Sequence, residues 1–525
     1  MVASPENFPL LKELLAEQRR LATPVARFAE VHEAGVNLPD FEPVYRDLIP
    51  LSLPKSGEQY AFEVDLDSCT GCKACVSACH SLNGLDDEET WRDVGLIVGG
   101  DHRHPVQQTV TTACHHCADP ACLNGCPVLA YEKDPVTGIV RHLDDQCIGC
   151  QYCVLKCPYD VPKYNARLGI VRKCDMCHSR LAEGEAPACV QACPTHAIRI
   201  VTVTTHVSGV AKMDTASFLP AAPDPAYTQP TTRYVSERPS QVTLVPSDIA
   251  VLRPQPPHWP LVVMLTLVPM AVGIQLVGLA FATESELVAT RLPLFAVMTG
   301  ALGLAASVLH LGQPLRAWRI FLGWRRSWLS REAMVFGAWF PLATLTLIEP
   351  PFLPMAATVG VTGLGCSVMI YVDTRRAFWR WTQTAPRFFG SAVLLGAATC
   401  LALSIAPVAS AAIVGLVTLA KLACDARIMR SLDAWDEDEI PPVSVTSARL
   451  LGGPLRNIFG TRVAVSLIAG LVLPALVVTQ YWPVYAAWLV LAMVLVTDLA
   501  ERYLFFRAVD APKMPGLPGV TGRSS

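Results

Sequence analysis

The sequence predicts a multi-domain chain in which a small cysteine-rich α+β domain precedes an all-α transmembrane bundle of about eight helices. Three observations predict this. Sixteen of the 19 cysteines lie between Cys69 and Cys193. Mean hydropathy is high (+0.36) and only 17% of residues are charged, as expected of a chain with a membrane portion. From Trp259 onward the chain is a succession of long apolar runs. The net charge of −3 gives no electrostatic reason to expect a nucleic-acid partner.

Composition divides the 525 residues into five segments. The first residues mix acidic and basic side chains with apolar ones and contain no uninterrupted hydrophobic stretch. We therefore expect neither a secretory signal nor a twin-arginine leader there. The predicted segments are an N-terminal polar arm (1–60), the cysteine-rich domain (61–205), a Pro/Thr/Ser-rich linker (206–257), a transmembrane anchor domain (258–508) and a C-terminal tail (509–525).

The sixteen clustered cysteines form four runs, and their spacing predicts four [4Fe–4S] clusters. Three thiolates from one tight C-x2-C-x2-C turn converge on one cubane, and the fourth cysteine, three residues further on, leads away and in two-cluster ferredoxins ligates the other cluster. The runs are Cys69-x2-Cys72-x2-Cys75-x3-Cys79, Cys114-x2-Cys117-x4-Cys122-x3-Cys126, Cys147-x2-Cys150-x2-Cys153-x3-Cys157 and Cys174-x2-Cys177-x11-Cys189-x3-Cys193.

Other uses of these cysteines fit the pattern less well. Zinc sites use C-x2-C pairs that are well separated in sequence, not triplets ending in C-x3-C-P. A disulfide framework is possible on count alone, but it does not suit a reducing compartment. His115 and His116 lie inside the second run, and with four cysteines available we expect them to lie beside a cluster or on the surface and not to be ligands. Basic residues next to ligands either tune cluster potentials or are simply solvated: Lys73, Lys156, Arg172 and Lys173.

The four runs resemble the four-cluster iron–sulfur subunit of the dimethyl sulfoxide reductase family of molybdopterin oxidoreductases. The resemblance implies a double bacterial-ferredoxin-like fold in which the first run pairs with the fourth and the second with the third. It implies four ligand groups, each numbered by the run that supplies three of its cysteines: first Cys69, Cys72, Cys75 and Cys193; second Cys114, Cys117, Cys122 and Cys157; third Cys147, Cys150, Cys153 and Cys126; fourth Cys174, Cys177, Cys189 and Cys79. Because Cys150 is present, each group is complete.

The apolar runs predict a lipid-embedded bundle, since a spanning helix needs about 20 apolar residues. Arginines crowd the loops after the second, fourth and sixth runs, whereas the opposite loops are nearly bare. The positive-inside rule then places both termini and the cysteine-rich domain on the cytoplasmic side of a bacterial-type inner membrane. The predicted spans are 260–282, 293–312, 332–349, 353–372, 388–406, 408–424, 463–480 and 482–500.

Four motifs of this half resemble the eight-span anchor subunit of the same family, here fused to the cluster subunit. They are Ser307-Val-Leu-His310-Leu-Gly-Gln-Pro314-Leu-Arg316-Ala, Ser327-Trp-Leu-Ser-Arg-Glu332, Tyr371-Val-Asp-Thr-Arg-Arg376 and Glu501-Arg-Tyr-Leu-Phe-Phe506.

Polar residues at the rim facing the clusters are candidates for binding a quinone and moving its protons. The candidates are His310, Glu332, Tyr371, Asp373 and Lys421. In family anchors the histidine of the HLG motif serves the quinol site. The plainer alternatives are a helix-end histidine, a helix N-terminal charge for Glu332 and a snorkelling Lys421.

These features predict an electron conduit between the quinone pool and a separate molybdopterin catalytic subunit. The resemblance is nearest to cytoplasmic sulfite dehydrogenases, so sulfite oxidation is the first candidate reaction. Reduction of dimethyl sulfoxide or another S- or N-oxide by quinol is the second, although that catalytic half is often exported; polysulfide, tetrathionate and formate remain open. Only His258 and His310 occur from the linker's end onward, so no haem is expected. Two other functions are alternatives. The first is an ion pump driven by ferredoxin-like electron input, which would place acidic or lysine residues near mid-membrane. The second is a purely structural anchor, which would not need His310.

Overall fold

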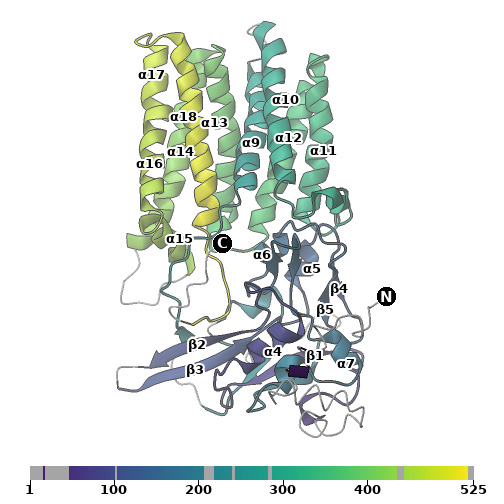
Figure 1. The fold of residues 1–525 in the computed structure, drawn as a ribbon. Coiled ribbons are helices and arrows are strands. Elements are labelled where there is room, and N and C mark those ends of the chain that lie inside the picture. The colour runs from purple at the N-terminus through teal and green to yellow at the C-terminus, as the bar shows by residue number, and fades with distance from the viewer. Residues whose placement is uncertain are drawn as a thin grey trace.

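The computed structural model describes residues 46–100, 103–205, 218–220, 222–238, 243–281, 286–433 and 443–517, with isolated positions 13, 16 and 17. A long helical bundle stands on a mixed α+β domain (Figure 1). The predicted fold class is confirmed in both parts. Most of the N-terminal arm, positions 206–217 of the linker and the last eight residues of the tail lie outside the described residues.

The cysteine-rich domain is built around two small sheets. In the first, the central strand β1 (Glu58–Asp65) pairs antiparallel with β8 (Ile198–Thr204) and parallel with β9 (Arg233–Val235). In the second, β2 (Asp93–Gly100) lies between β3 (Pro105–Thr112) and β10 (Val245–Pro246). Two hairpins follow the second and third cysteine runs: β4 (Tyr131–Lys133) with β5 (Val140–His142), and β6 (Lys163–Asn165) with β7 (Ile170–Arg172).

Short helices carry the cysteines between these strands, so the ligand loops stay near one another. Their bounds are α4 (Ala74–Leu82), α5 (Ala121–Gly125), α6 (Tyr152–Lys156), α7 (His178–Ala182) and α8 (Ala188–Gln191). Figure 1 shows α5 and α6 directly beneath the bundle and α4 and α7 at the far end of the domain.

The bundle contains eight long helical segments in the described part of the chain, as the sequence predicts. They are α9 (Trp259–Ala280), α10 (Glu286–Val308), α11 (Trp328–Leu345), α12 (Leu353–Val372), α13 (Trp381–Ala402), α14 (Pro407–Asp433), α16 (Arg456–Leu467) continued through η8 (Ile468–Val472) and α17 (Leu473–Val478), and α18 (Ala487–Arg507). Six of these segments are long and apolar enough to cross a membrane. The other two, α11 and α18, carry buried charges such as Glu332 and Asp498.

Shorter elements connect these parts. They are α15 (Val443–Gly452) and the one- or two-turn helices η2 (Arg46–Leu48), η4 (Pro225–Tyr227), η5 (Pro314–Phe321), η6 (Pro350–Phe352), η7 (Ala377–Trp379) and η9 (Val484–Ala486). The linker contributes regular structure, because β9 and β10 belong to it and extend both sheets. The C-terminal tail also returns to the cysteine-rich domain, where the Leu96 amide donates to the Gly516 carbonyl (3.2 Å) and Met514 is buried.

Candidate functional site

Two cavities in the cysteine-rich domain are each lined by four of the expected ligands. The first holds Cys69, Cys72, Cys75 and Cys193. The second holds Cys114, Cys117, Cys122 and Cys157. Residues from distant runs therefore meet in the combinations that the resemblance implied.

The other two groups are recognised by how their thiols act on one another. Burial raises the pKa of Cys79 to about 12, and the nearby Cys189 and Cys177 contribute to the rise. Burial likewise raises the pKa of Cys153 well above its ordinary value, with Cys150, Cys147 and Cys126 beside it. Such crowded, buried thiols become stable thiolates only when bound metal cations offset their charge.

The backbone of the ligand loops is shaped for this task. Gly71 and Gly149 precede the second cysteine of their runs with positive φ (72° and 67°), and the residues after those cysteines, Lys73 and Gln151, are also left-handed. Two turns of this kind in close succession wrap the chain around the thiols. Amide groups also point at sulfur: Ala130 N lies 3.2 Å from Cys126 Sγ, and Ala197 N lies 3.3 Å from Cys193 Sγ. Hydrogen bonds to sulfur help to set the potentials of iron–sulfur clusters.

The donor set fits cubanes better than single ions. Across the described ranges, no three His, Cys, Asp or Glu side chains are arranged to hold one metal ion. Each cavity instead spreads four thiols around its wall. His115 and His116 are buried beside the second cavity. His115 Nδ1 lies 2.9 Å from Thr232 Oγ1, and His116 Nδ1 accepts from the Val140 amide (3.1 Å).

The third cysteine run lies against the membrane half. Gln313 N donates to the Ile148 carbonyl (3.1 Å), and Gly323 N donates to the Pro127 carbonyl (2.7 Å). A Cβ on Gly149 would meet the Gly312 backbone, so the two loops approach closely. The ligand group of Cys126, Cys147, Cys150 and Cys153 is therefore the one nearest the bundle.

His310 follows α10 at this junction. Its ring packs edge-on against His258 (centroids 5.2 Å apart), which in turn contacts Phe506 (5.4 Å). His310 also lies close to the Cys150 backbone, which places it beside the third ligand group.

Glu332 and Tyr371 lie on the neighbouring helices α11 and α12. Glu332 is 5% exposed and accepts a hydrogen bond from the Ser367 hydroxyl. Tyr371 is 3% exposed, and its ring contacts Phe506 (5.8 Å), the same ring that contacts His258. The structure thus groups His310 and Tyr371 around one aromatic cluster at the rim, with Glu332 on the helix beside it.

Asp373 has a different environment. Its carboxylate is 2.6 Å from Lys156 Nζ, and Lys156 also donates to the Asp373 carbonyl (3.0 Å). Lys156 belongs to α6, within the third cysteine run. Asp373 therefore joins the two halves of the chain.

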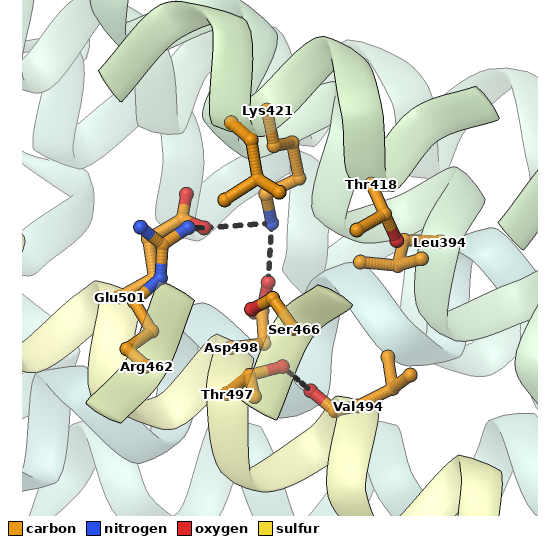
Figure 2. Close-up of a pocket in the computed structure, with 10 residues that line it drawn as sticks. Leu394, Thr418, Lys421, Arg462, Ser466, Val494, Thr497, Asp498 and Glu501 are labelled. Carbon is orange, nitrogen blue, oxygen red and sulfur yellow. Dashed lines mark hydrogen bonds and ion pairs between the residues drawn. The ribbon is translucent and has the colours of Figure 1, made fainter. Parts of the chain in front are cut away.

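Lys421 lies near the midpoint of α14, because this helix runs past the predicted end of its span to Asp433. The apolar run stops before Asp425, but the helix continues to Asp433 because Asp425 is buried in ion pairs. A small cavity beside Lys421 is lined by side chains from α13, α14, α16 and α18, including Thr418, Ser466 and Thr497 (Figure 2).

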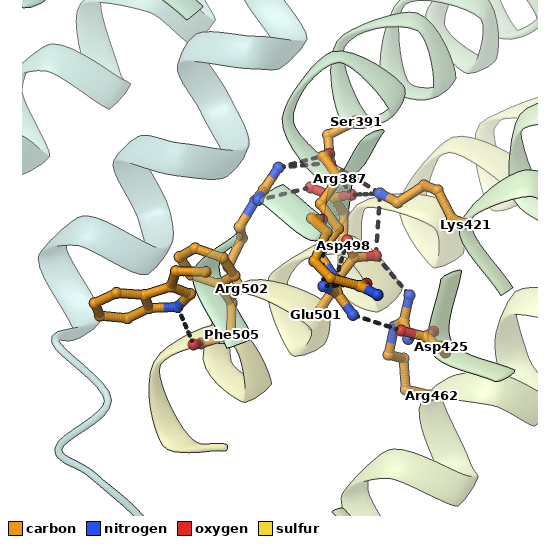
Figure 3. A network of polar contacts seen from close by, with 11 residues as sticks. Arg387, Ser391, Lys421, Asp425, Arg462, Asp498, Glu501, Arg502 and Phe505 are labelled. Carbon is orange, nitrogen blue, oxygen red and sulfur yellow. Dashed lines mark hydrogen bonds and ion pairs between the residues drawn. The ribbon is translucent and has the colours of Figure 1, made fainter. Parts of the chain in front are cut away.

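Lys421 is one of seven buried charges that meet between these four helices (Figure 3). Its Nζ is 2.5 Å from Asp498 Oδ1 and 3.1 Å from Glu501 Oε2. We call this set the ion-pair network; its members are Arg387, Lys421, Asp425, Arg462, Asp498, Glu501 and Arg502. Sequence reasoning missed six of them. The i, i+3 spacing of Asp498 and Glu501 in an otherwise apolar run was the available signal.

Comparisons with known proteins agree with this division of the chain. Residues 255–507 match the family model of the DMSO reductase anchor subunit, 106–203 that of a 4Fe-4S dicluster domain and 60–81 that of a 4Fe-4S binding domain. A probable anaerobic dimethyl sulfoxide reductase protein, YnfG of Escherichia coli K12, is 42% identical over 148 residues, which are 27% of this chain and 72% of that protein. The B subunit of the anaerobic dimethyl sulfoxide reductase of Haemophilus influenzae is 41% identical over 150 residues, 27% of this chain and 73% of that subunit. The hydrogenase-2 operon protein HybA of Escherichia coli O157:H7 is 37% identical over 160 residues, 26% of this chain and 49% of HybA.

Proposed function

We propose a function from one premise: the chain belongs to the dimethyl sulfoxide reductase family, and it joins the iron–sulfur subunit and the membrane anchor in one polypeptide. It is an electron-transfer subunit of an oxidoreductase complex. We infer that four [4Fe–4S] clusters carry electrons between a separate molybdopterin catalytic subunit and membrane quinone. Each cluster supplies one-electron redox chemistry when it is bound.

The ligand groups suggest the order of the path. Cys72, in the first group, is exposed, so that end suits contact with a catalytic subunit. Cys174 of the fourth group lies near Cys114 of the second. The third group adjoins the bundle. Electrons would therefore pass through the first, fourth, second and third groups in sequence.

One observation carries the quinone assignment: the loop of Cys147 to Cys150 is in backbone contact with the loop of His310. A quinone at His310 would exchange electrons with the nearest cluster without an intervening carrier. Quinol oxidation releases two electrons and two protons, so the site needs groups that bind the oxygens and take protons. We assign His310 and Glu332 to these tasks, with Tyr371 beside them in the aromatic cluster at the rim. Asp373 and Lys421, which are held in ion pairs, are assigned structural roles.

Substitution of His310 tests this assignment. His310→Arg in the assembled complex should abolish electron exchange with quinone, assayed both as quinone reduction and as quinol oxidation, while iron content and cluster spectra stay unchanged. Leu315→Arg is the matched control, because Leu315 lies in the same loop and is 94% exposed. Unchanged quinol oxidation in His310→Arg would rule out the site.

The substrate of the catalytic subunit is the second part of the proposal. We propose sulfite as electron donor, which follows from a cytoplasmic placement of the cluster domain. The similarity to dimethyl sulfoxide reductase proteins favours a second candidate, quinol-dependent reduction of an S- or N-oxide. The purified complex should reduce quinone with sulfite; oxidation of quinol by dimethyl sulfoxide, with no sulfite activity, would support the second candidate.

The cytoplasmic placement has its own test. The basic loops support it, but several of their arginines also bind the cluster domain: Arg319 donates to the Asp145 carbonyl (2.7 Å) and Arg376 to the Leu155 carbonyl (3.2 Å). The arginines in these loops therefore have two roles to explain them: they follow the positive-inside rule, and they bind the cluster domain. Reporter fusions after residue 525 should be active as a fluorescent protein and inactive as alkaline phosphatase. The reverse pattern would place the domain outside.

A further inference from the structure

Arg92 carries a positive charge into the interior of the cysteine-rich domain. It is 2% exposed, and its guanidinium carbon lies 4.5 Å above the ring of Phe62. Nη1 donates to Thr111 Oγ1 (3.2 Å), whereas Nε and Nη2 have no hydrogen-bond partner among the described residues. None of the ion pairs in the described part of the chain includes Arg92. A buried charge without a counter-charge is strongly unfavourable, so this arginine requires a source of negative charge.

The groups that surround Arg92 are cluster ligands from two different groups. Thr111, its hydrogen-bond partner, lies 3.5 Å from Cys75 Sγ in the first group. Burial opposes the charge on Arg92, but the thiols of Cys189, Cys75, Cys174 and Cys79 raise its pKa in spite of burial. Three of these four belong to the fourth group. The guanidinium therefore lies between the first and fourth groups.

Lys173 repeats this arrangement one step along the path. It is 2% exposed, and its Nζ donates to backbone carbonyls, those of Cys174 (2.9 Å) and Val140. It forms none of the ion pairs among the described residues. Lys173 lines the cavity that holds Cys114 and Cys122 of the second group, and it directly precedes Cys174 of the fourth group.

We propose that Arg92 and Lys173 are electrostatic tuning residues of the electron path, Arg92 shared by the first and fourth clusters and Lys173 by the fourth and second. This inference rests on the four-cluster ligand assignment proposed above. A cluster held by four thiolates becomes more negative when it accepts one electron. A cation nearby stabilises the reduced form more than the oxidised form, so it raises the reduction potential.

The sharing pattern gives a test that a merely structural role would not satisfy. The full chain, assembled with its catalytic subunit in detergent, is titrated electrochemically while cluster signals are followed by electron paramagnetic resonance. Arg92→Met should move two clusters to lower potential and leave the other two unchanged. Lys173→Met should also lower two, with one signal common to both variants. Unshifted potentials in either variant, with clusters loaded, would overturn the proposal for that residue.

Matched variants separate charge from shape. Arg92→Lys keeps the charge and should keep the potentials; a shift as large as that of Arg92→Met would contradict the proposal. Arg167→Met removes a charge at the surface, where Arg167 pairs with Asp86 (3.0 Å), and should shift no cluster. If Arg92→Met does not load iron but Arg92→Lys loads fully, the result supports a requirement for the positive charge at this position. If neither variant loads iron, the proposal is overturned. The four-cluster assignment, on which this inference rests, is tested separately by the iron content of the wild type. About sixteen iron atoms per chain are expected, about four for each cluster. About eight would refute the presence of four clusters.

Discussion

Lys156 and Asp373 connect the cluster domain to the membrane bundle through an ion pair that is buried on one side only. The ammonium group is 2.6 Å from the carboxylate, and the two side chains are 5% and 34% exposed. Lys156 also lies 5.5 Å from the ring of Tyr227, whose hydroxyl donates to the Asp373 carbonyl (2.9 Å). One residue at the end of α12 thus receives contacts from the third cysteine run and from the linker.

Removal of this link should loosen the two halves. Lys156→Met leaves the Asp373 carboxylate without its charged donor, and we expect a loss of about 1.5–3 kcal/mol, the usual worth of a hydrogen bond to a charged group. Thermal unfolding in detergent measures it. Lys163→Met is the control, because Lys163 pairs with Asp160 at the surface and should contribute at most about 0.5 kcal/mol. Equal effects of the two variants would contradict a linking role.

The ion-pair network predicts a large penalty for removing one member. Glu501 accepts from Arg462 Nη2 (2.5 Å) and Lys421 (3.1 Å), so Glu501→Gln leaves the four buried cations of the network with only two carboxylates, Asp425 and Asp498. Breaking a buried ion pair in this way costs about 3–5 kcal/mol. The variant should unfold at a clearly lower temperature, whereas Glu349→Gln, at an exposed position, should unfold with the wild type. A thermal curve that matches the wild type would mean that the network contributes little.

Asp510 predicts a pH dependence of stability. Burial raises the pKa of Asp510 from 3.8 to about 6, although Arg376 opposes the rise. Between about pH 4 and pH 6 the unfolded chain loses this proton and the folded chain keeps it, so stability falls as pH rises through that window. Asp510→Asn carries no charge at any pH. The advantage of the variant in unfolding temperature should therefore be greater at pH 7 than at pH 4, and a constant difference would contradict this.

Close backbone packing around Gly312 predicts a defect in electron delivery. Gly312→Ala forces the loop of His310 away from the β6–β7 turn, because the new Cβ would overlap the Gly169 backbone, and that turn packs against Gly149 of the third cysteine run. Quinol oxidation should fall roughly ten- to a hundredfold, the effect of small misplacements on reacting groups, with iron content unchanged. Gly337→Ala is the control, since a Cβ there meets no atom within 4 Å. Wild-type rates in Gly312→Ala would show that the contact is dispensable.

Local patterns made much of this molecule predictable. The cluster ligands could be predicted because the ligands of a cubane come mostly from one tight turn of the chain. The membrane spans could be predicted because a helix that crosses a bilayer needs a long apolar stretch. Long-range partners were not predictable. Lys421 was expected at a helix end because Asp425 interrupts the apolar run, but arginines from α13 and α16 neutralise Asp425 and the helix continues. Arg92 escaped notice because it lies outside the cysteine runs whose ligands it faces. Strands as short as β9 and β10 leave no readable alternation.

The return of the C-terminal tail has a consequence for biogenesis. Met514 completes an apolar cluster with residues of β1, β2 and β9, and Gly516 bonds to the backbone of β2. Met514 and Gly516 are among the last described residues to leave the ribosome, and α18 precedes them. The cysteine-rich domain, although translated first, therefore cannot be finished until α18 has been made. A chain stalled before residue 509 would therefore expose to the cell's proteases a cysteine-rich domain that lacks these contacts.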